Sequence, residues 1–360
     1  MNEFFCQTRI VTGPDAMQVL PGLQSRRLLV VTDPFFAENG TAERIAGLSG
    51  AAQTRIFDRV EPDPTVTLAA EGAATLRRFQ PDTVVALGGG SAMDCAKAMC
   101  FFSGSRPQLV AIPTTSGSGS EVTDFAVLTH EGVKHPLVDE ALRPKLAILD
   151  STLVAQLPPR LVAEGGFDLL SHALEAYVAT GASPCTDALA LEAFRRAMEL
   201  LPASFRGDAA AREALHGGAT MAGLAFSRAG LGLCHALSHA LGGEFHVPHG
   251  CLNAILLPGV IACNAAAAAP RYGRLARQTG LSTGGDAVAL RALKNALIQL
   301  RRALSLPQNL SQAGISPLQL REMLDKLVAA ALADPCCATN PVPPTRELAR
   351  QVLLEVAGHG

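Results

Sequence analysis

Tryptophan is absent from this chain, and only 17% of its 360 residues are charged. Its 30 Lys and Arg residues nearly balance 32 Asp and Glu residues, which leaves a net charge of −2. Because positive and negative residues are nearly equal in number, the composition indicates no basic surface for binding nucleic acid. No run of Lys or Arg indicates binding to a membrane surface either. The start, Met1–Gln7, has no basic segment followed by a long apolar stretch, so we expect no secretory signal.

Paired cysteines of the metal-binding or redox type are missing as well. The nine cysteines include no Cys-x-x-Cys pair, and reduced thiols in a cytoplasmic enzyme are the simplest interpretation. The longest apolar run, 254–269, is interrupted by Pro258 and Asn264 and is a poor membrane-spanning helix. Apolar residues are abundant, at 48%. This is enough for a large core and for the interface of a homodimer or higher homo-oligomer.

The length predicts two domains, because single cores rarely grow beyond roughly 250–300 residues. The first 150 or so residues alternate short apolar runs with helical periodicity, which is typical of a mostly parallel sheet covered by helices. The predicted strands are Arg27–Asp33, Thr83–Leu87 and Gln108–Pro113, and the clearest predicted helix between them is Val66–Phe79.

The rest of the chain has only helical patterns, for example in Thr186–Leu201, Ala287–Ala303 and Pro317–Ala333. We therefore predict an α/β nucleotide-binding domain over residues 1–155 and an all-α domain over residues 156–360.

A glycine-rich turn joins a predicted strand to a predicted helix at Gly88-Gly89-Gly90-Ser91. Glycines let the backbone approach a pyrophosphate, and the helix that follows offers free N–H groups at its positive end. The spacing is not that of the common Gly-x-Gly-x-x-Gly fingerprint, so a plain tight turn is an equal alternative for this loop alone.

A second loop of small hydrogen-bonding residues, 113–121, follows the next predicted strand and favours a phosphate-bearing cofactor over two plain turns. Asp33, at the end of the first strand, could bind a ribose hydroxyl, which would favour NAD over NADP. The alternative is that Asp33-Pro34 begins a helix, with Asp33 as its cap.

Metal-type ligands occur at two places in the second half. Asp168 and His172 are four residues apart, and so are His235 and His239, so each pair shares one face of a helix. His249 follows in a short loop. These five residues suit iron(II), zinc, cobalt or manganese. Glu175, three residues beyond His172, is expected to support the site without binding metal. A metal that polarises a carbonyl and a nicotinamide that delivers hydride would together account for both halves of the chain.

With these residues in place, the chain resembles the iron-containing (group III) alcohol dehydrogenase family from about Arg9 to Pro344. The matching segments are Gly88–Lys97, Pro113–Thr123, Gly165–Tyr177, Gly230–Gly250 and Thr339–Pro341. The resemblance implies the dehydroquinate synthase-like fold, with an α/β nucleotide-binding domain followed by an all-helical metal-binding domain. It also implies NAD(H) and one divalent metal, Fe²⁺ in preference to Zn²⁺.

The resemblance also assigns roles to individual residues. It implies four metal ligands, Asp168, His172, His235 and His249, and makes His239 a residue near the nicotinamide that relays the alcohol proton. The implied cofactor contacts are Asp33, Asp63, Gly88, Gly89, Gly90, Ser91, Asp94, Thr114, Thr115, Ser118, Thr123, Lys134 and Leu153.

Within the family the chain is most similar to the short propanol dehydrogenases of bacterial propanediol-utilisation microcompartments. This implies an NAD-dependent oxidoreductase that interconverts short aldehydes, such as propanal and acetaldehyde, with primary alcohols and regenerates NAD⁺. It also implies a cytoplasmic location, inside such a compartment, with shell or enzyme partners there. The alternatives are a zinc polyol dehydrogenase of the glycerol type, an NAD-recycling synthase or lyase of the same fold, and a non-catalytic compartment component.

Overall fold

The computed structural model describes residues 4–358. The chain divides into two compact units, one over Phe5–Leu157 and one from Pro158 onward, and Phe4 is grouped with the second. The boundary that we predict, between residues 155 and 156, falls just before this division. Part of Met1–Gln7, the segment in which we expect no secretory signal, lies outside the described residues.

The first unit is built on a parallel sheet of six strands in the order β1-β8-β5-β4-β2-β3. The strands are β1 (Arg9–Gly13), β2 (Arg27–Val31), β3 (Gln53–Phe57), β4 (Thr83–Gly88), β5 (Gln108–Pro113) and β8 (Leu146–Asp150). The chain runs from β2 outward to β3 and then returns past β2 to β4. Neighbouring loops after β2 and β4 therefore lie at the point where the strand order reverses, and open α/β sheets bind their ligands there.

Alternate residues of each central strand enter two separate cores. Leu29 and Val31 pack with helices α3 (Val66–Phe79) and α4 (Gly90–Ser103) on one face of the sheet. Leu28 and Val30 pack on the other face with the 3₁₀ helix η1 (Ala16–Leu23) and with α2 (Thr41–Ser49). Because both faces are covered, the central strands are continuously apolar, as parallel strands usually are.

Shorter elements complete this unit. The helical ones are α1 (Pro34–Glu38), η2 (Ser120–Val122), η3 (Glu140–Leu142) and α5 (Ser151–Val154). Strands β6 (Phe125–His130) and β7 (Val133–Val138) form a separate antiparallel pair. The sequence patterns did not predict this pair.

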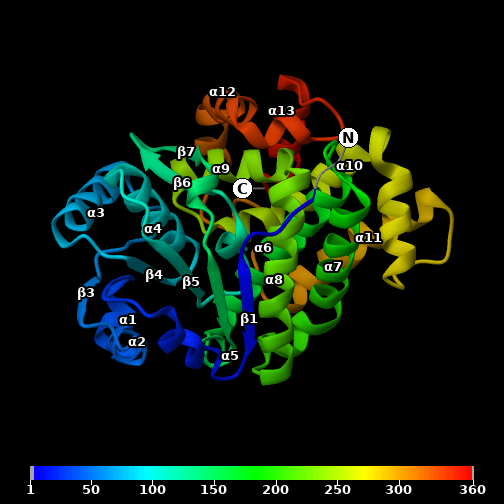
Figure 1. The fold of residues 1–360 in the computed structure, drawn as a ribbon. Helices are drawn as coiled ribbons and strands as arrows, with labels where there is room; N and C mark the ends of the chain where they lie inside the picture. The colour runs from blue at the N-terminus through cyan, green and yellow to red at the C-terminus, as the bar shows by residue number, and fades with distance from the viewer. Residues whose placement is uncertain (1–3, 359–360) are drawn as a thin grey trace. The chain divides into compact units, whose positions relative to one another are not determined.

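Among the described residues from Pro158 onward, all regular elements are helices (Figure 1). They are α6 (Pro159–Val178), α7 (Pro184–Phe205), α8 (Ala209–Ala229), α9 (Leu233–Phe245), α10 (His249–Gln278), α11 (Asp286–Ala303), α12 (Pro317–Ala333), η4 (Pro335–Thr339) and α13 (Arg346–Glu355). The three helical segments predicted here correspond to α7, α11 and α12.

Helix α10 is the longest helix and runs through the core of this unit. By length and composition it could cross a membrane, but 72% of its most apolar stretch is buried inside the protein, as in the core helix of a globular domain. Pro258 breaks the apolar run, but it does not interrupt the helix, which continues to Gln278. A proline has no N–H for the carbonyl four residues earlier, and here Arg301 Nη1 donates to that carbonyl, Ala254 O, at 2.9 Å.

Candidate metal centre and cofactor loops

The predicted cofactor residues of the first unit follow the carboxyl ends of five parallel strands. Asp33 follows β2, Asp63 follows β3, and Leu153 follows β8. The glycine-rich turn ends β4, and the second loop follows β5. Parallel strands bring these ends to one edge of the sheet, so the topology gathers residues that are up to 120 positions apart (33 to 153).

The two phosphate-type loops are in direct contact. Gly88 O accepts a hydrogen bond from Thr114 N–H at 2.9 Å. A Cβ added at Gly89 would lie 3.4 Å from the Thr115 side chain, and one at Gly90 would lie 3.2 Å from Ser118 Cβ. Gly88 itself has φ +145°, and its Cβ would come within 2.7 Å of Ala92 Cβ, so only glycine fits this turn without strain.

Helix α4 begins at the last of these glycines, Gly90, with Gly89 as its N-cap and Ser91 in its first turn. The first N–H groups of a helix have no partner within the helix, and the positive end of the helix dipole lies there. The turn therefore has the geometry and charge that suit a pyrophosphate.

Of the two interpretations of Asp33, the structure shows the helix cap, and ribose binding stays a prediction. Asp33 Oδ1 accepts from Phe36 N–H at 3.2 Å and caps α1, with Pro34 at the first helical position. Its Oδ2 faces the glycine-rich turn, 3.6 Å from where a Cβ of Gly88 would lie. The carboxylate thus lies at the reversal point of the sheet, where a ribose hydroxyl could reach it.

A buried lysine that we did not single out holds the second loop. Lys97, on α4, is 1% exposed, and its Nζ lies within 2.9 Å of Ser120 O, Ser120 Oγ, Thr123 Oγ1 and Phe125 O. Burial lowers the pKa of Lys97 to about 8, against the opposing effect of Asp94. The sequence signal was available, since a charged residue in a run of apolar helix positions requires buried partners.

Two predicted cofactor residues are part of this network. Asp94 accepts from Ser120 Oγ at 2.8 Å and from Val127 N–H at 3.1 Å, and burial raises the pKa of its carboxyl. Thr123 is fully buried beneath Lys97. Both residues fix the shape of the second loop, and direct contact with a cofactor remains a prediction for each.

The remaining predicted cofactor residues of this unit are Asp63, Lys134, Leu153 and Thr114. Lys134 on β7 forms an ion pair of 2.7 Å with Asp63, which has a left-handed backbone at φ 55°. Leu153 is half-buried in α5 and packs against the apolar core below it. Thr114 is buried at the start of the second loop, next to Gly88.

The metal-type residues of the second unit come from three helices. Asp168 and His172 lie one turn apart on α6, His235 lies in the first turn of α9, and His249 is the first residue of α10. Gly250 lets α10 begin very close to α6, because a Cβ at this position would lie 2.0 Å from Glu164 O. Segments that are 81 positions apart (168 to 249) thus supply one cluster.

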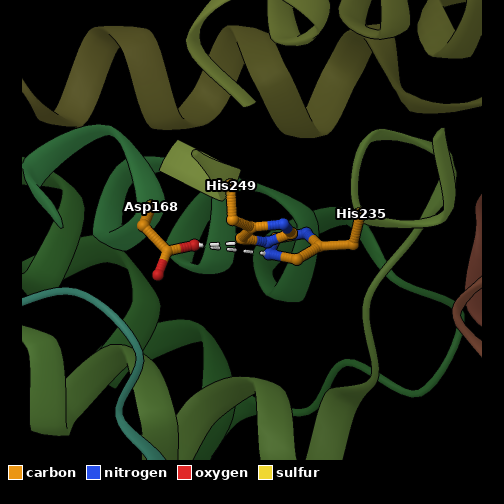
Figure 2. Close-up of side chains that lie close together, drawn as sticks. All are labelled: Asp168, His235 and His249. Carbon is orange, nitrogen blue, oxygen red and sulfur yellow. Dashed lines mark ion pairs between the residues drawn. The ribbon is translucent and has the colours of Figure 1, made fainter. Parts of the chain in front are cut away.

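Three of these side chains point at one another (Figure 2). Asp168 Oδ1 lies 3.5 Å from His249 Nε2 and 3.9 Å from His235 Nε2, and the ligand atoms of all three residues lie within 4.8 Å of each other. Two ligands about 2.1 Å from a tetrahedral metal are about 3.4 Å apart, so these separations are close to those of a coordination site.

His172 lies against this cluster and completes the predicted set of four. Its Nδ1 is 3.7 Å from Asp168 Oδ1, and its ring stacks on His235, with centroids 4.5 Å apart, and on Phe226. All four residues that the family resemblance implies as ligands are therefore neighbours.

The hydrogen bonds around His235 test whether this cluster suits a metal. Its Nδ1 pairs with Glu175 at 2.5 Å, which leaves the second ring nitrogen to face Asp168. That Nε2 atom is buried and makes no hydrogen bond. A buried nitrogen without a partner is costly, and a cation there would satisfy its lone pair. The donor set and this unsatisfied atom fit a divalent ion such as Fe²⁺ or Zn²⁺.

Charge balance in the cluster points the same way. Burial raises the pKa of the Asp168 carboxyl, but His172, His235 and His249 outweigh it, so the net shift is well downward and the carboxylate is anionic. Asn253 Nδ2 also donates to Asp168 Oδ1, at 3.1 Å. The pattern did not identify Asn253, because an amide in an apolar helix has no spacing that marks it as a partner of a distant carboxylate.

His239 does not belong to the three-residue cluster, although it is one turn from His235 on α9. Its ring stacks on His249, with centroids 5.1 Å apart, and its Nδ1 pairs with Asp334 Oδ2 at 2.8 Å. Asp334 is 95 positions away, at the end of α12, and no spacing in the sequence points to it.

Comparison with known proteins identifies the family. Residues 7–151 match the iron-containing alcohol dehydrogenase model, and residues 162–356 match the C-terminal model of the Fe-containing alcohol dehydrogenase family. The chain belongs to the iron-containing alcohol dehydrogenase family.

Individual relatives cover nearly the whole chain. The 1-propanol dehydrogenase PduQ of Salmonella typhimurium is 40% identical, over 99% of this chain and 100% of the relative. The solved iron-containing alcohol dehydrogenase of Thermococcus thioreducens is 32% identical with a TM-score of 0.90, covering 99% of both chains. A sulfoacetaldehyde reductase of Bifidobacterium kashiwanohense, solved with NAD⁺, is 27% identical with a TM-score of 0.88, covering 100% of both chains.

These findings confirm the predicted family and fold class, and the enzyme class with its cofactors. The protein is a metal-dependent, NAD(H)-linked alcohol dehydrogenase whose family uses iron. Its substrates are small alcohols and aldehydes.

Proposed function

We propose that this enzyme reduces short aldehydes, propanal and acetaldehyde among them, with NADH and so regenerates NAD⁺. The observation that carries the proposal is the buried, unsatisfied Nε2 of His235, which faces an anionic Asp168 beside His249. A cation-binding cluster of this kind, in a chain that also carries two phosphate-type loops, supports hydride chemistry at a polarised carbonyl.

Asp168, His172, His235 and His249 are the proposed ligands of one divalent metal. When bound, the metal would supply Lewis acidity to the aldehyde oxygen, and NADH would supply the hydride. Glu175 keeps the lone pair of His235 Nε2 directed at the cluster, because it accepts the Nδ1 proton.

The proposed NAD(H) site consists of the loops at the carboxyl edge of the sheet. The glycine-rich turn and the start of α4 hold the pyrophosphate, the second loop closes on it, and Asp33 binds the ribose. Its members are Asp33, Asp63, Gly88, Gly89, Gly90, Ser91, Asp94, Thr114, Thr115, Ser118, Thr123, Lys134 and Leu153.

His239 is the proposed proton donor to the alcohol product. Asp334 accepts the Nδ1 proton of His239 and fixes the tautomer and plane of the ring. With Nδ1 held by Asp334, only Nε2 can exchange protons, taking one from water and passing it to the product oxygen. The orientation of the ring therefore determines whether Nε2 can reach that oxygen.

The test is aldehyde-dependent NADH oxidation by anaerobically purified protein, before and after complete metal removal and after restoring Fe²⁺ or Zn²⁺. We expect activity to disappear with the metal and to return most strongly with iron. Full activity in the metal-free protein would contradict the proposal. Activity with zinc and glycerol-type substrates only would favour the polyol dehydrogenase, and NAD that is retained without net turnover would favour a synthase or lyase.

We further propose a homodimer or higher homo-oligomer in the cytoplasm, inside a propanediol-type microcompartment and in contact with its shell or enzymes. The support is the similarity to PduQ of Salmonella typhimurium. Light scattering on the purified protein tests the oligomer, and co-purification with intact compartments tests the location.

A further inference from the structure

Beside the metal centre, and sharing none of its four proposed ligands, lies a second group of metal-type side chains. His239 on α9, Asp334 at the end of α12 and Cys336 on η4 have ligand atoms that all lie within 4.8 Å of one another. The side chains of His239 and Asp334 are 18% and 9% exposed. The group is therefore sheltered but can be reached from solvent.

Hydrogen bonds hold two of the three side chains, those of Asp334 and His239. Asp334 Oδ1 accepts from Cys336 N–H at 2.8 Å and caps η4, while its Oδ2 pairs with His239 Nδ1 at 2.8 Å. A nitrogen and an oxygen at this separation are only slightly closer than two ligands of one tetrahedral metal, for which about 3.4 Å is expected.

The electrostatic surroundings favour a cation. The pKa of Asp334 falls to about 2, because hydrogen bonding to His239 and the charge interaction with it outweigh burial. Burial raises the pKa of the Cys336 thiol well above its ordinary value, as do the negative charge of Asp334 and that of Glu175. The negative charges of Asp334 and Glu175 thus disfavour a free thiolate at Cys336. A bound divalent ion would compensate these charges and stabilise the thiolate.

We propose that His239, Asp334 and Cys336 form a second, inhibitory site for a thiol-seeking divalent cation of the Zn²⁺ class. Imidazole, carboxylate and thiolate together suit zinc, cadmium or cobalt, whereas magnesium and calcium prefer oxygen ligands alone. The first centre has no cysteine among its proposed ligands, so the two sites differ in softness.

Binding requires one deprotonation and one tautomer change. The Cys336 thiol gives up its proton to solvent as the sulfur–metal bond forms, and no electrons are transferred. The proton on His239 Nδ1 moves to Nε2 through solvent, so that Nδ1 can bind the metal. The occupied site therefore withdraws His239 from the proton transfer assigned to it under the proposed function, and inhibition follows.

Spectroscopy tests the site without relying on activity. Metal-free protein is titrated with Co²⁺ under anaerobic conditions, and the thiolate-to-cobalt charge-transfer absorption is followed. We expect two equivalents to bind and one of them to produce the thiolate band. Cys336→Ser should abolish the band.

The adjacent cysteine provides a matched control. Cys337 Sγ donates to Ala331 O at 3.1 Å and lies outside the group, so Cys337→Ser should keep the band. If the unaltered protein shows no thiolate-to-cobalt band after two or more equivalents of Co²⁺, the proposal is overturned. A band that persists in Cys336→Ser, or one that disappears in Cys337→Ser, would do so as well.

A second measurement addresses inhibition. Excess Zn²⁺ should slow NADH oxidation by the iron-loaded enzyme. With each protein's rates normalised to its own uninhibited rate, the inhibition constant of Cys336→Ser should be about 10-fold or more above that of the unaltered enzyme. If the iron-loaded enzyme oxidises no NADH, the proposed function fails while the cobalt result still stands. Equal inhibition of both variants would overturn the inhibitory role.

Discussion

At the scale of single residues, Glu175 is the clearest case of a side chain that acts through another. Its carboxylate pairs with His235 Nδ1 and accepts N–H bonds from Gly232 and Cys234. We expect Glu175→Gln to weaken metal affinity by about 10- to 100-fold, the usual cost of losing such a partner. Competition with a chromophoric chelator measures this affinity.

Glu192, a half-buried residue of α7 that pairs with Arg195 and lies outside the cluster, offers a control for that experiment. Glu192→Gln should bind metal like the unaltered protein. Unchanged metal affinity in Glu175→Gln, with folding intact by circular dichroism, would show that the tautomer of His235 does not matter.

Asp334 gives the second prediction at this scale. General acid–base groups contribute about 10²–10⁴-fold to rates, so losing the orientation of His239 should cost part of that. We expect Asp334→Asn to lower kcat about 10- to 100-fold, with KM for the aldehyde nearly unchanged and iron content preserved. A loss of iron, or a kcat equal to that of the unaltered enzyme, would argue against positioning.

Thiol reactivity separates buried from exposed cysteines. Burial raises the pKa of Cys95 and of Cys100 to about 12, so both remain protonated at neutral pH. Cys6 and Cys185 are exposed. Iodoacetamide at neutral pH should label these two first and leave Cys95 and Cys100 unlabelled until unfolding, as peptide mass spectrometry would show. Early labelling of Cys95 would contradict the packing of α4.

At the scale of elements, helix α10 is continuous because another helix compensates for its proline. Removing the guanidinium in Arg301→Met should destabilise the fold by about 1–3 kcal/mol, the cost of an unsatisfied buried carbonyl at Ala254. The exposed neighbour provides the control, since Arg302→Met should have little effect. Urea unfolding measures both.

A double mutant makes this prediction specific. In Pro258→Ala the new N–H can pair with Ala254 O, so Arg301→Met should then cost clearly less. Strictly additive costs would show that Arg301 stabilises α10 in some other way.

Elements differed in how well the sequence predicted them. Central strands such as β2 and β5 are continuously buried and apolar, and helix α3 has a regular apolar face, so their patterns were clear. Edge strand β3 is mostly exposed and polar, and β1 is also partly exposed, so neither has a marked pattern. The β6–β7 pair depends on contacts with α4 and on the hydrogen bond from Val127 N–H to Asp94. The residue pattern within the two strands carries no sign of these distant partners.

The site was predictable to the same degree. Spacing placed Asp168 with His172 and His235 with His239, because a single helix determines those relations. It did not separate His235 from His239, since both lie on one face of α9. What separates them is Glu175 on one side and Asp334 on the other, 60 and 95 positions away. Pairings at that range come from tertiary packing.

At the scale of the whole molecule, the residues proposed to bind the metal and those proposed to bind NAD(H) belong to different units. All proposed metal residues follow Pro158, and all proposed NAD(H) residues precede Leu157. We expect metal to slow amide exchange mainly in α6, α9 and α10, and NADH to slow it mainly in the loops after β4 and β5. Hydrogen-exchange mass spectrometry with each ligand alone measures this, and protection from NADH that is absent from residues 5–157 would contradict the assignment.

The close approach of α10 to α6 at Gly250 limits how the metal centre can be altered. The residue next to a proposed ligand is usually an attractive place to diversify when an enzyme is adapted to a new substrate. Here any side chain would meet Glu164 O and displace His249 from Asp168. Libraries aimed at this centre should keep Gly250 fixed and vary positions where added volume meets flexible side chains.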